Sequence, residues 1–342
     1  MSEGEEGFVP DLSTHYLGLS LRNPLVAAAG ALSKKLDSLR KLEDAGVGAV
    51  VLHSLFEEQI AHESQELDYY LTRLTNATPE AATWFPDVGN YNMEPDQYLE
   101  HIRSAKEALS VPVIASLNGF TLGGWSKWDS RIEEAGADAL ELNVYQVQTN
   151  PDVTSAQVED DFVALVHEVR KQVKIPVAVK LSPFFAGLPN LARRLAQAGS
   201  NGLVLFNRFL QPDIDPENLD VSPTIQLSTS GDLRLPLRWA AILHDTLPVD
   251  LAVTSGIHTG RDLVKVVMSG AAVGQVASEL IAKGPQRAAG ILTELADWMR
   301  DYEYTSVAQM RGALSHKNAA DPTAYERANY MKALQSFDDK LV

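Results

Sequence analysis

The sequence predicts one (β/α)8 barrel of the TIM-barrel class, preceded by a short β-ribbon and followed by a helical tail. The main observation is a joint that recurs four times. In it, an amphipathic helix ends in Ala-Gly or Ser-Gly and a run rich in Val, Leu and Ala follows, at 43–54, 133–144, 196–207 and 267–278. Glycine just past a helix supplies the left-handed residue that ends it, and strands with unbroken apolar runs are buried on both faces, as in a parallel sheet. Eight such strands alternating with helices over 342 residues fit a closed barrel better than an open sheet.

The expected elements follow one another in a regular order. Residues 12–22 alternate weakly around Gly18, which predicts a small β-ribbon able to plug one end of the barrel. The apolar runs predict eight barrel strands, at 25–30, 49–55, 113–119, 139–145, 177–183, 203–209, 251–256 and 273–277. Long connections follow the second, fourth and sixth strands, at 56–97, 146–159 and 210–231. They therefore lie on the carboxyl-terminal face of the barrel, where active sites form.

Three regions are expected along the chain. Residues 1–10 form a flexible acidic leader, 11–305 form the barrel, and 306–342 form a tail. A helical stretch at 323–337 carries aromatic and apolar residues. This pattern predicts that the tail packs on the barrel or on a second copy of the chain.

The composition excludes several classes of partner. The net charge is −16, whereas proteins that bind nucleic acids or anionic membranes need clustered Lys and Arg. No apolar run approaches the length of a membrane span, and the acidic start MSEGEEGF differs from a signal peptide, so we expect a cytoplasmic protein. The absence of cysteine rules out disulfides, thiolate metal sites and a cysteine base. Since no Asp, Glu or His cluster has metal-ligand spacing, we expect no metal.

The stretch 250–285 predicts a phosphate-binding site. It reads as apolar strand, glycine turn, helix, second apolar strand and a turn into another helix, so backbone N–H groups open at two neighbouring strand ends. In barrel enzymes the loops after the last two strands commonly hold a phosphate. A third glycine turn, after the sixth strand, reaches the same edge. The expected residues are Ser230, Gly231, Ser255, Gly256, Ala277 and Ser278. His258 is expected to cap the turn or contact the phosphate, and the alternative is that the glycines only permit tight turns.

Polar side chains stand near the ends of several predicted strands. Lys180 lies in the apolar fifth strand, where an inward ammonium is costly unless it meets an anion or a polar acceptor. It either stabilises negative charge on a ligand or faces solvent. Asn118, Asn143 and Asn207 end neighbouring strands and suit a planar, oxygen-rich ligand, although each could instead cap a turn. We expect Glu141 to be an ordinary solvent charge.

These segments resemble the dihydroorotate dehydrogenases, FMN-containing (β/α)8 barrels, over the range from about Leu17 to about Ser315. The matching segments are NPLVAAAG, ALELNV, VAVKLSP, VLFNRFLQPDID, SGDLRLPLR, TSGIHTGRDLVKVVMSGAAVGQVASEL and SVAQMRGAL. The resemblance implies bound FMN, with its phosphate on the backbone around the two strand ends described above and Lys180 near the flavin ring. It also implies a homodimer. Further residues implied at the flavin or the substrate are Ala29, Gly30, Asn92, Asn118, Asn143 and Asn207.

The sequence departs from this family where the chemistry takes place. The family uses a Cys or Ser after the fourth strand to remove a proton, and Gln146 stands at that position, where it cannot act as a base. His53 stands where the family usually has a second lysine, and TWFPDV replaces an asparagine-bearing substrate segment. His53 or Tyr145 could supply an acid or base, but a lone histidine in a buried strand can also be a satisfied core residue.

Three functions remain open from the sequence. The first is an FMN-dependent oxidoreductase that acts on the CH–CH bond of a small carboxylated substrate, dihydroorotate among the candidates, by hydride transfer to flavin N5. The second is an FMN-binding protein without that turnover, serving as an electron carrier or partner subunit. The third is a flavin-free phosphosugar lyase or synthase on the same barrel.

Overall fold

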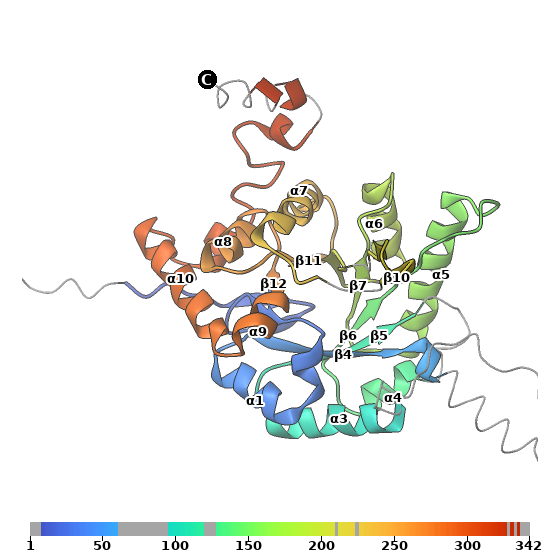
Figure 1. The fold of residues 1–342 in the computed structure, drawn as a ribbon. Coiled ribbons are helices and arrows are strands. Elements are labelled where there is room, and N and C mark those ends of the chain that lie inside the picture. Colours follow the sequence, from blue (N-terminus) through green and yellow to red (C-terminus); the bar gives the residue numbers. More distant parts are fainter. Residues whose placement is uncertain are drawn as a thin grey trace, which may run out of the picture.

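Eight parallel strands close into a barrel, in the order β11-β12-β3-β4-β5-β6-β7-β8. The computed structural model describes residues 8–60, 95–119, 128–208, 211–222, 226–326, 329–331 and 334–335. Helices surround the barrel and follow its strands along the chain (Figure 1). The predicted (β/α)8 class is confirmed.

Seven of the eight strands end earlier than the sequence predicts. They span Leu25–Ala27 (β3), Ala49–Phe56 (β4), Val113–Asn118 (β5), Ala139–Asn143 (β6), Val177–Leu181 (β7), Gly202–Leu205 (β8), Asp250–Thr254 (β11) and Val273–Val276 (β12). The predicted boundaries were wrong because apolar and small residues continue past the last paired residue. There the backbone already turns toward the next helix, as at Ser255 and Gly256, whose φ angles are 73° and 83°.

The helices are amphipathic and carry their own start and stop signals. Thr154 and Gln157 form a capping box at the start of α5, and Phe162, Leu165, Val166 and Val169 line its buried face at helical spacing. The glycines of the four recurring joints all have φ between 97° and 108°. The helices are α1 Leu36–Asp44, α3 Pro95–Ala108, α4 Trp128–Glu134, α5 Ser155–Gln172, α6 Leu188–Gln197, α7 Arg234–Leu243, α8 Gly260–Met268, α9 Ser278–Lys283 and α10 Arg287–Asp301.

The predicted β-ribbon is present and plugs the amino-terminal end of the barrel. Strands β1 (Thr14–Tyr16) and β2 (Leu19–Leu21) pair antiparallel. Tyr16 and Leu17 pack in one cluster with inward-facing barrel residues such as Val51 and Ile114. The N–H of Leu17 also donates to Asp250, the first residue of β11. The ribbon therefore closes the interior of the barrel at its amino-terminal end.

The last part of the chain leaves the barrel beside α7 (Figure 1). A short helix α11, Val307–Met310, is buried at both ends. Farther on, Arg238 of α7 donates to the carbonyl oxygen of Tyr325 at 2.9 Å. The division into leader, barrel and tail stays a prediction. Within the described residues, no helix has the length and apolar character needed to cross a membrane.

Substitution of Gly256 by alanine tests the packing behind the predicted phosphate turn. An added Cβ there would lie 2.3 Å from the backbone nitrogen of Leu233, and its φ is +83°. We expect Gly256→Ala to lower the free energy of unfolding by roughly 2–4 kcal/mol, through overlap and backbone strain. Urea denaturation measures this loss.

Gly187→Ala is the matched control. No atom lies within 4 Å of its added Cβ, and its φ of −109° suits alanine. We expect a change of less than about 1 kcal/mol. Equal effects of the two substitutions would contradict the packing described for Gly256.

Candidate functional site

A polar group crosses the otherwise apolar interior of the barrel. Glu141 of β6 is 1% exposed. Its Oε1 lies 3.3 Å from Nζ of Lys180 on β7, and its Oε2 accepts a 2.7 Å hydrogen bond from the side-chain amide of Gln275 on β12. The prediction that Glu141 is a solvent charge was wrong. Alternate residues of β6 point inward, and the barrel wall excludes water from that side.

This ion pair explains the lysine in an apolar strand. Lys180 is 6% exposed, and the anion it needs is Glu141. Its ammonium is therefore held at a fixed place inside the barrel.

Polar side chains form a row at the carboxyl-terminal ends of these strands, and Lys180 of the ion pair is one of them. Asn118, Asn143 and Lys180 are register partners on the adjacent strands β5, β6 and β7. Asn207 follows β8, and its N–H donates to Leu181 at the end of β7. The structure therefore brings these four predicted residues to one side of the barrel mouth.

A buried amide oxygen of this row lacks a partner. Among the described residues, nothing donates to Oδ1 of Asn143. A buried acceptor left unsatisfied costs about 1–3 kcal/mol. A bound molecule that presents N–H or O–H groups would satisfy it, so the row fits a planar ligand with hydrogen-bond donors.

The end of β3 adjoins the end of β12. The N–H of Ala28 donates to the carbonyl of Val276 at 3.0 Å. A small cavity between the two strand ends is lined by Ala28, Gly30, Val276 and Ala277. The predicted Ala29 and Gly30 therefore lie close to the predicted phosphate end of the site.

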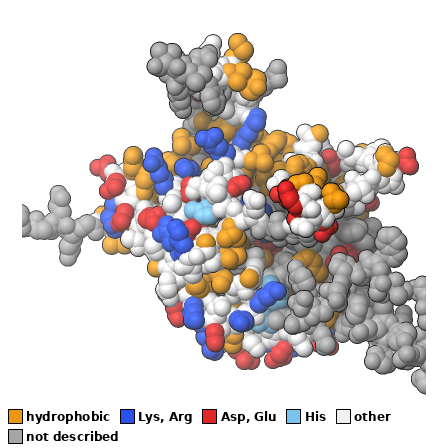
Figure 2. Space-filling model, in the orientation of Figure 1, with side chains coloured by type: hydrophobic (Ala, Val, Ile, Leu, Met, Phe, Trp, Pro, Cys, Tyr) orange, Lys and Arg blue, Asp and Glu red, His pale blue; other side chains and the backbone are white. Residues whose placement is uncertain are grey.

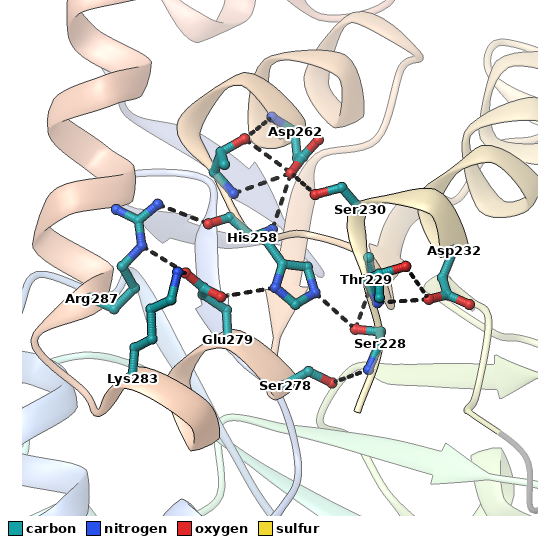
Figure 3. Close-up of polar contacts among 12 residues, drawn as sticks. Ser228, Thr229, Ser230, Asp232, His258, Asp262, Ser278, Glu279, Lys283 and Arg287 are labelled. Atoms are coloured by element: carbon teal, nitrogen blue, oxygen red, sulfur yellow. Dashed lines mark hydrogen bonds and ion pairs between the residues drawn. The ribbon is translucent and has the colours of Figure 1, made fainter. Parts of the chain in front are cut away.

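Three loops meet at that end in a group that we call the serine cluster, made of Ser228, Gly256, His258 and Ser278; Figure 3 labels its three side chains. The N–H of Ser228 donates to Oγ of Ser278 at 3.0 Å. The Oγ of Ser228 lies 3.2 Å from Nε2 of His258 and accepts a 3.2 Å hydrogen bond from the N–H of Gly256. The N–H of Gly256 is used inside the cluster, and the two serine hydroxyls are the donors that fit a phosphate group.

Sequence reasoning selected a neighbouring residue of this loop. Ser230 donates its hydroxyl to Asp262 at 2.8 Å, and that carboxylate also accepts from the backbone of His258 and Thr259. Those groups are therefore occupied in capping α8. Ser228, two residues earlier in the same turn, contacts Ser278 and Gly256. Phosphate binding by Ser230 and Gly231 stays a prediction.

Charges of both signs surround the serine cluster. Figure 2 shows acidic and basic side chains interspersed over α8, α9 and α10. Burial alone would raise the pKa of Asp262, but hydrogen bonds from Ser230, Lys265 and Thr259 lower it below its usual value. This carboxylate is ionised near neutral pH and serves as the cap of α8.

His53 is buried on β4 beside a second histidine. Its ring lies edge-on to Tyr98 and 5.6 Å from the ring of His101. Burial, followed by the charges of His101 and Lys34, lowers its pKa to about 4. A base works best when its pKa lies near the operating pH, so His53 is poorly suited to take a proton near neutral pH. As a neutral ring, it remains able to hydrogen-bond.

The position at which the family resemblance places the base lies just beyond β6. Tyr145 and Gln146 are both half-buried there. Asn92 and the TWFPDV segment lie outside the described residues. Among the described residues, no group of three or more His, Asp or Glu side chains is placed to hold a metal ion.

Lys180→Met tests the ion pair. It leaves Glu141 charged and unpaired inside the barrel, so we expect a loss of about 3–5 kcal/mol in the free energy of unfolding. The double variant Lys180→Met/Glu141→Gln removes the stranded charge and should recover most of the loss. A double variant as unstable as the single one, in urea denaturation, would show that the pair does not govern stability here.

The pH dependence of stability tests the state of His53. Because its folded pKa is lowered from 6.5 to about 4, the unfolded chain binds more protons between these values. Stability is therefore full above pH 6.5 and falls as the pH drops toward 4. We expect the wild type to lose up to roughly 3 kcal/mol more than His53→Gln over this window. Parallel pH profiles in urea denaturation would contradict a neutral, buried His53.

Comparisons with known proteins agree with this architecture. A family model described as "Dihydroorotate dehydrogenase" matches residues 11–299. The catalytic subunit of dihydroorotate dehydrogenase B (NAD(+)) from Thermoplasma acidophilum is 27% identical over 314 residues, covering 88% of this chain and 98% of that protein. The chloroplastic dihydropyrimidine dehydrogenase (NADP(+)) of Arabidopsis thaliana is 24% identical over 329 residues, covering 89% of this chain and 76% of that protein. The chain belongs to the dihydroorotate dehydrogenase family.

Proposed function

We propose that this protein is an FMN-dependent oxidoreductase that acts on the CH–CH bond of a small, carboxylated dihydropyrimidine such as dihydroorotate. One observation carries the proposal. Asn118, Asn143 and Lys180 stand in register on adjacent strands, with an unsatisfied amide oxygen on Asn143 and an ammonium on Lys180 that Glu141 holds in place. The relatives named above take their names from dihydroorotate and dihydropyrimidine, which supports this class of substrate.

The residues of the barrel mouth divide between the two ends of such a cofactor. The serine cluster would bind its phosphate, together with the backbone around Ala277. Lys180 would lie near its ring system, where a fixed ammonium stabilises negative charge. Ala29 and Gly30 would leave room for the flat ring, because they carry little or no side chain. When bound, FMN supplies the hydride acceptor.

Substrate would bind against the same row from the open side. Asn143 and Asn207 offer both donors and acceptors to a ring amide and a carboxylate. Asn92 is proposed to join them. These contacts would orient the substrate, which accounts for a large part of the rate that an enzyme can supply.

Proton removal sets the limit on turnover. Gln146 cannot accept a proton, and neutral His53 is a weak base. Tyr145 is the other side chain that we propose could exchange a proton there. We therefore expect slow turnover of dihydroorotate, or a physiological substrate whose proton is lost more easily.

We also propose a cytoplasmic homodimer. The hairpin of β9 (Asp213–Asp215) and β10 (Asp220–Ser222) exposes Ile214, Leu219 and Val221 at 73%, 91% and 57%. Exposed apolar groups of this kind are typical of protein contacts. The relative named as a catalytic subunit makes a separate electron-accepting partner the other candidate for this hairpin.

Anaerobic mixing with dihydroorotate tests the reaction. The bound flavin of the wild type should bleach slowly. Gln146→Ser should raise the bleaching rate by roughly 10² or more, because a positioned base contributes about 10²–10⁴. Gln146→Ala, which removes the amide but adds no base, should stay as slow as the wild type.

Other outcomes separate the alternatives. Flavin that binds but is never reduced, in the wild type or in Gln146→Ser, would indicate an FMN-binding protein without this turnover. Purified protein that is colourless and has no affinity for FMN would contradict both flavin hypotheses and favour a flavin-free lyase or synthase.

A further inference from the structure

His258 lies between β11 and α8, and its two ring nitrogens face different groups (Figure 3). Nδ1 lies 2.9 Å from Oε2 of Glu279, and Nε2 lies 3.2 Å from Oγ of Ser228. The same Oγ accepts the N–H of Gly256. The imidazole therefore connects a carboxylate to the oxygen at the centre of the serine cluster.

Glu279 is a buried anion with cationic partners. Only 3% of it is exposed. Its Oε1 lies 2.8 Å from Nζ of Lys283 and 2.8 Å from Nε of Arg287, which leaves Oε2 for His258. Burial alone would raise the pKa of Glu279, but hydrogen bonds from Lys283, Arg287 and His258 lower it to about 2. An ionised carboxylate only accepts hydrogen bonds, so Nδ1 of His258 must carry the hydrogen and donate it.

The backbone of His258 is also hydrogen-bonded to neighbouring side chains. Arg287 donates to the carbonyl oxygen of His258 at 2.9 Å and to Glu294 at 2.6 Å. The other oxygen of Glu294 accepts the N–H of Gly260 at 2.6 Å. These bonds fix the ring in one orientation, with Nε2 directed at Ser228.

This orientation lets the ring control the hydroxyl of Ser228. In a neutral ring that carries hydrogen on Nδ1, Nε2 accepts from that hydroxyl. With a second hydrogen on Nε2, the ring donates to Oγ of Ser228 instead, and the hydroxyl hydrogen is free to donate to a phosphate oxygen while Glu279 balances the charge from behind.

We propose that His258, held by Glu279, is a positioning residue of the phosphate site: it directs the hydroxyl of Ser228, which binds the phosphate together with Ser278. The proposal rests on the proposed binding of FMN. It adds side-chain donors to the backbone groups, and it assigns Glu279 the role of fixing which nitrogen faces Ser228.

His258→Ala tests the contact, with FMN and riboflavin as paired probes. Riboflavin carries the same ring system without the phosphate. We expect the dissociation constant for FMN, measured by flavin fluorescence with the apoprotein, to rise about 10- to 100-fold, the loss for a hydrogen bond to a charged group. The constant for riboflavin should not change. His316→Ala makes the same substitution at a histidine in the tail, 36% exposed, and should change neither constant.

Glu279→Gln tests the positioning role. Glutamine keeps an acceptor for Nδ1 but removes the charge, so we expect a smaller loss of FMN affinity and none for riboflavin. Nitrogen NMR of the ring provides a second readout. In the wild type, FMN but not riboflavin should protonate Nε2, and in Glu279→Gln the preference for hydrogen on Nδ1 should weaken.

The outcomes distinguish this proposal from the function on which it rests. A wild-type protein that binds neither flavin would overturn both. FMN binding with an unchanged ratio of FMN to riboflavin affinity in His258→Ala would overturn the role of His258 alone. Should that variant fail to fold, a wild-type Nε2 signal that does not respond to FMN would overturn it equally.

Discussion

A carboxylate buried inside the barrel, Glu141, organises the polar side of the mouth. Its side chain is 1% exposed, so the charge requires partners, and it obtains them from two other strands. Lys180 is thereby held as a fixed cation. The amide oxygen of Asn143, on the same strand as Glu141, is left without a donor among the described residues. A site with a fixed cation and an unsatisfied acceptor is already arranged for a ligand before one arrives.

The proposed function divides the mouth into two ends. The serine cluster is linked to α8, α9 and α10 through His258, Glu279 and Arg287. The opposite end, just beyond β6, holds the half-buried Tyr145 and Gln146. In the proposal the first end binds the cofactor and the second carries the chemistry, two tasks that separate loops of a barrel can hold independently.

The sequence was sufficient for the fold because the signals are local. Each recurring joint combines an amphipathic helix, a terminal glycine and an apolar strand, and all of these lie within a dozen residues. The row of Asn118, Asn143, Lys180 and Asn207 could also be predicted, since strand ends of a parallel barrel meet at one face. Most strands were predicted to extend too far toward their carboxyl-terminal ends. The pattern of side chains does not show where the backbone stops pairing with the neighbouring strand.

Other features of the site depend on contacts between distant residues. The sequence could not show that Glu141 is buried. Its partners inside the barrel, Lys180 of β7 and Gln275 of β12, are far from it along the chain. Ser228 could not be preferred to Ser230 without the position of Asp262, 32 residues from Ser230. The low pKa of His53 reflects first its burial and then the charges of His101 and Lys34, which reach it from other elements.

The number of FMN molecules bound per chain tests the central claim most directly. Equilibrium dialysis of the purified protein against FMN measures it without assuming any substrate. The arrangement of Lys180, Asn143 and the serine cluster in one mouth predicts one FMN per chain. Absence of saturable binding would contradict the account, and with it the assignment of this barrel mouth to a flavin.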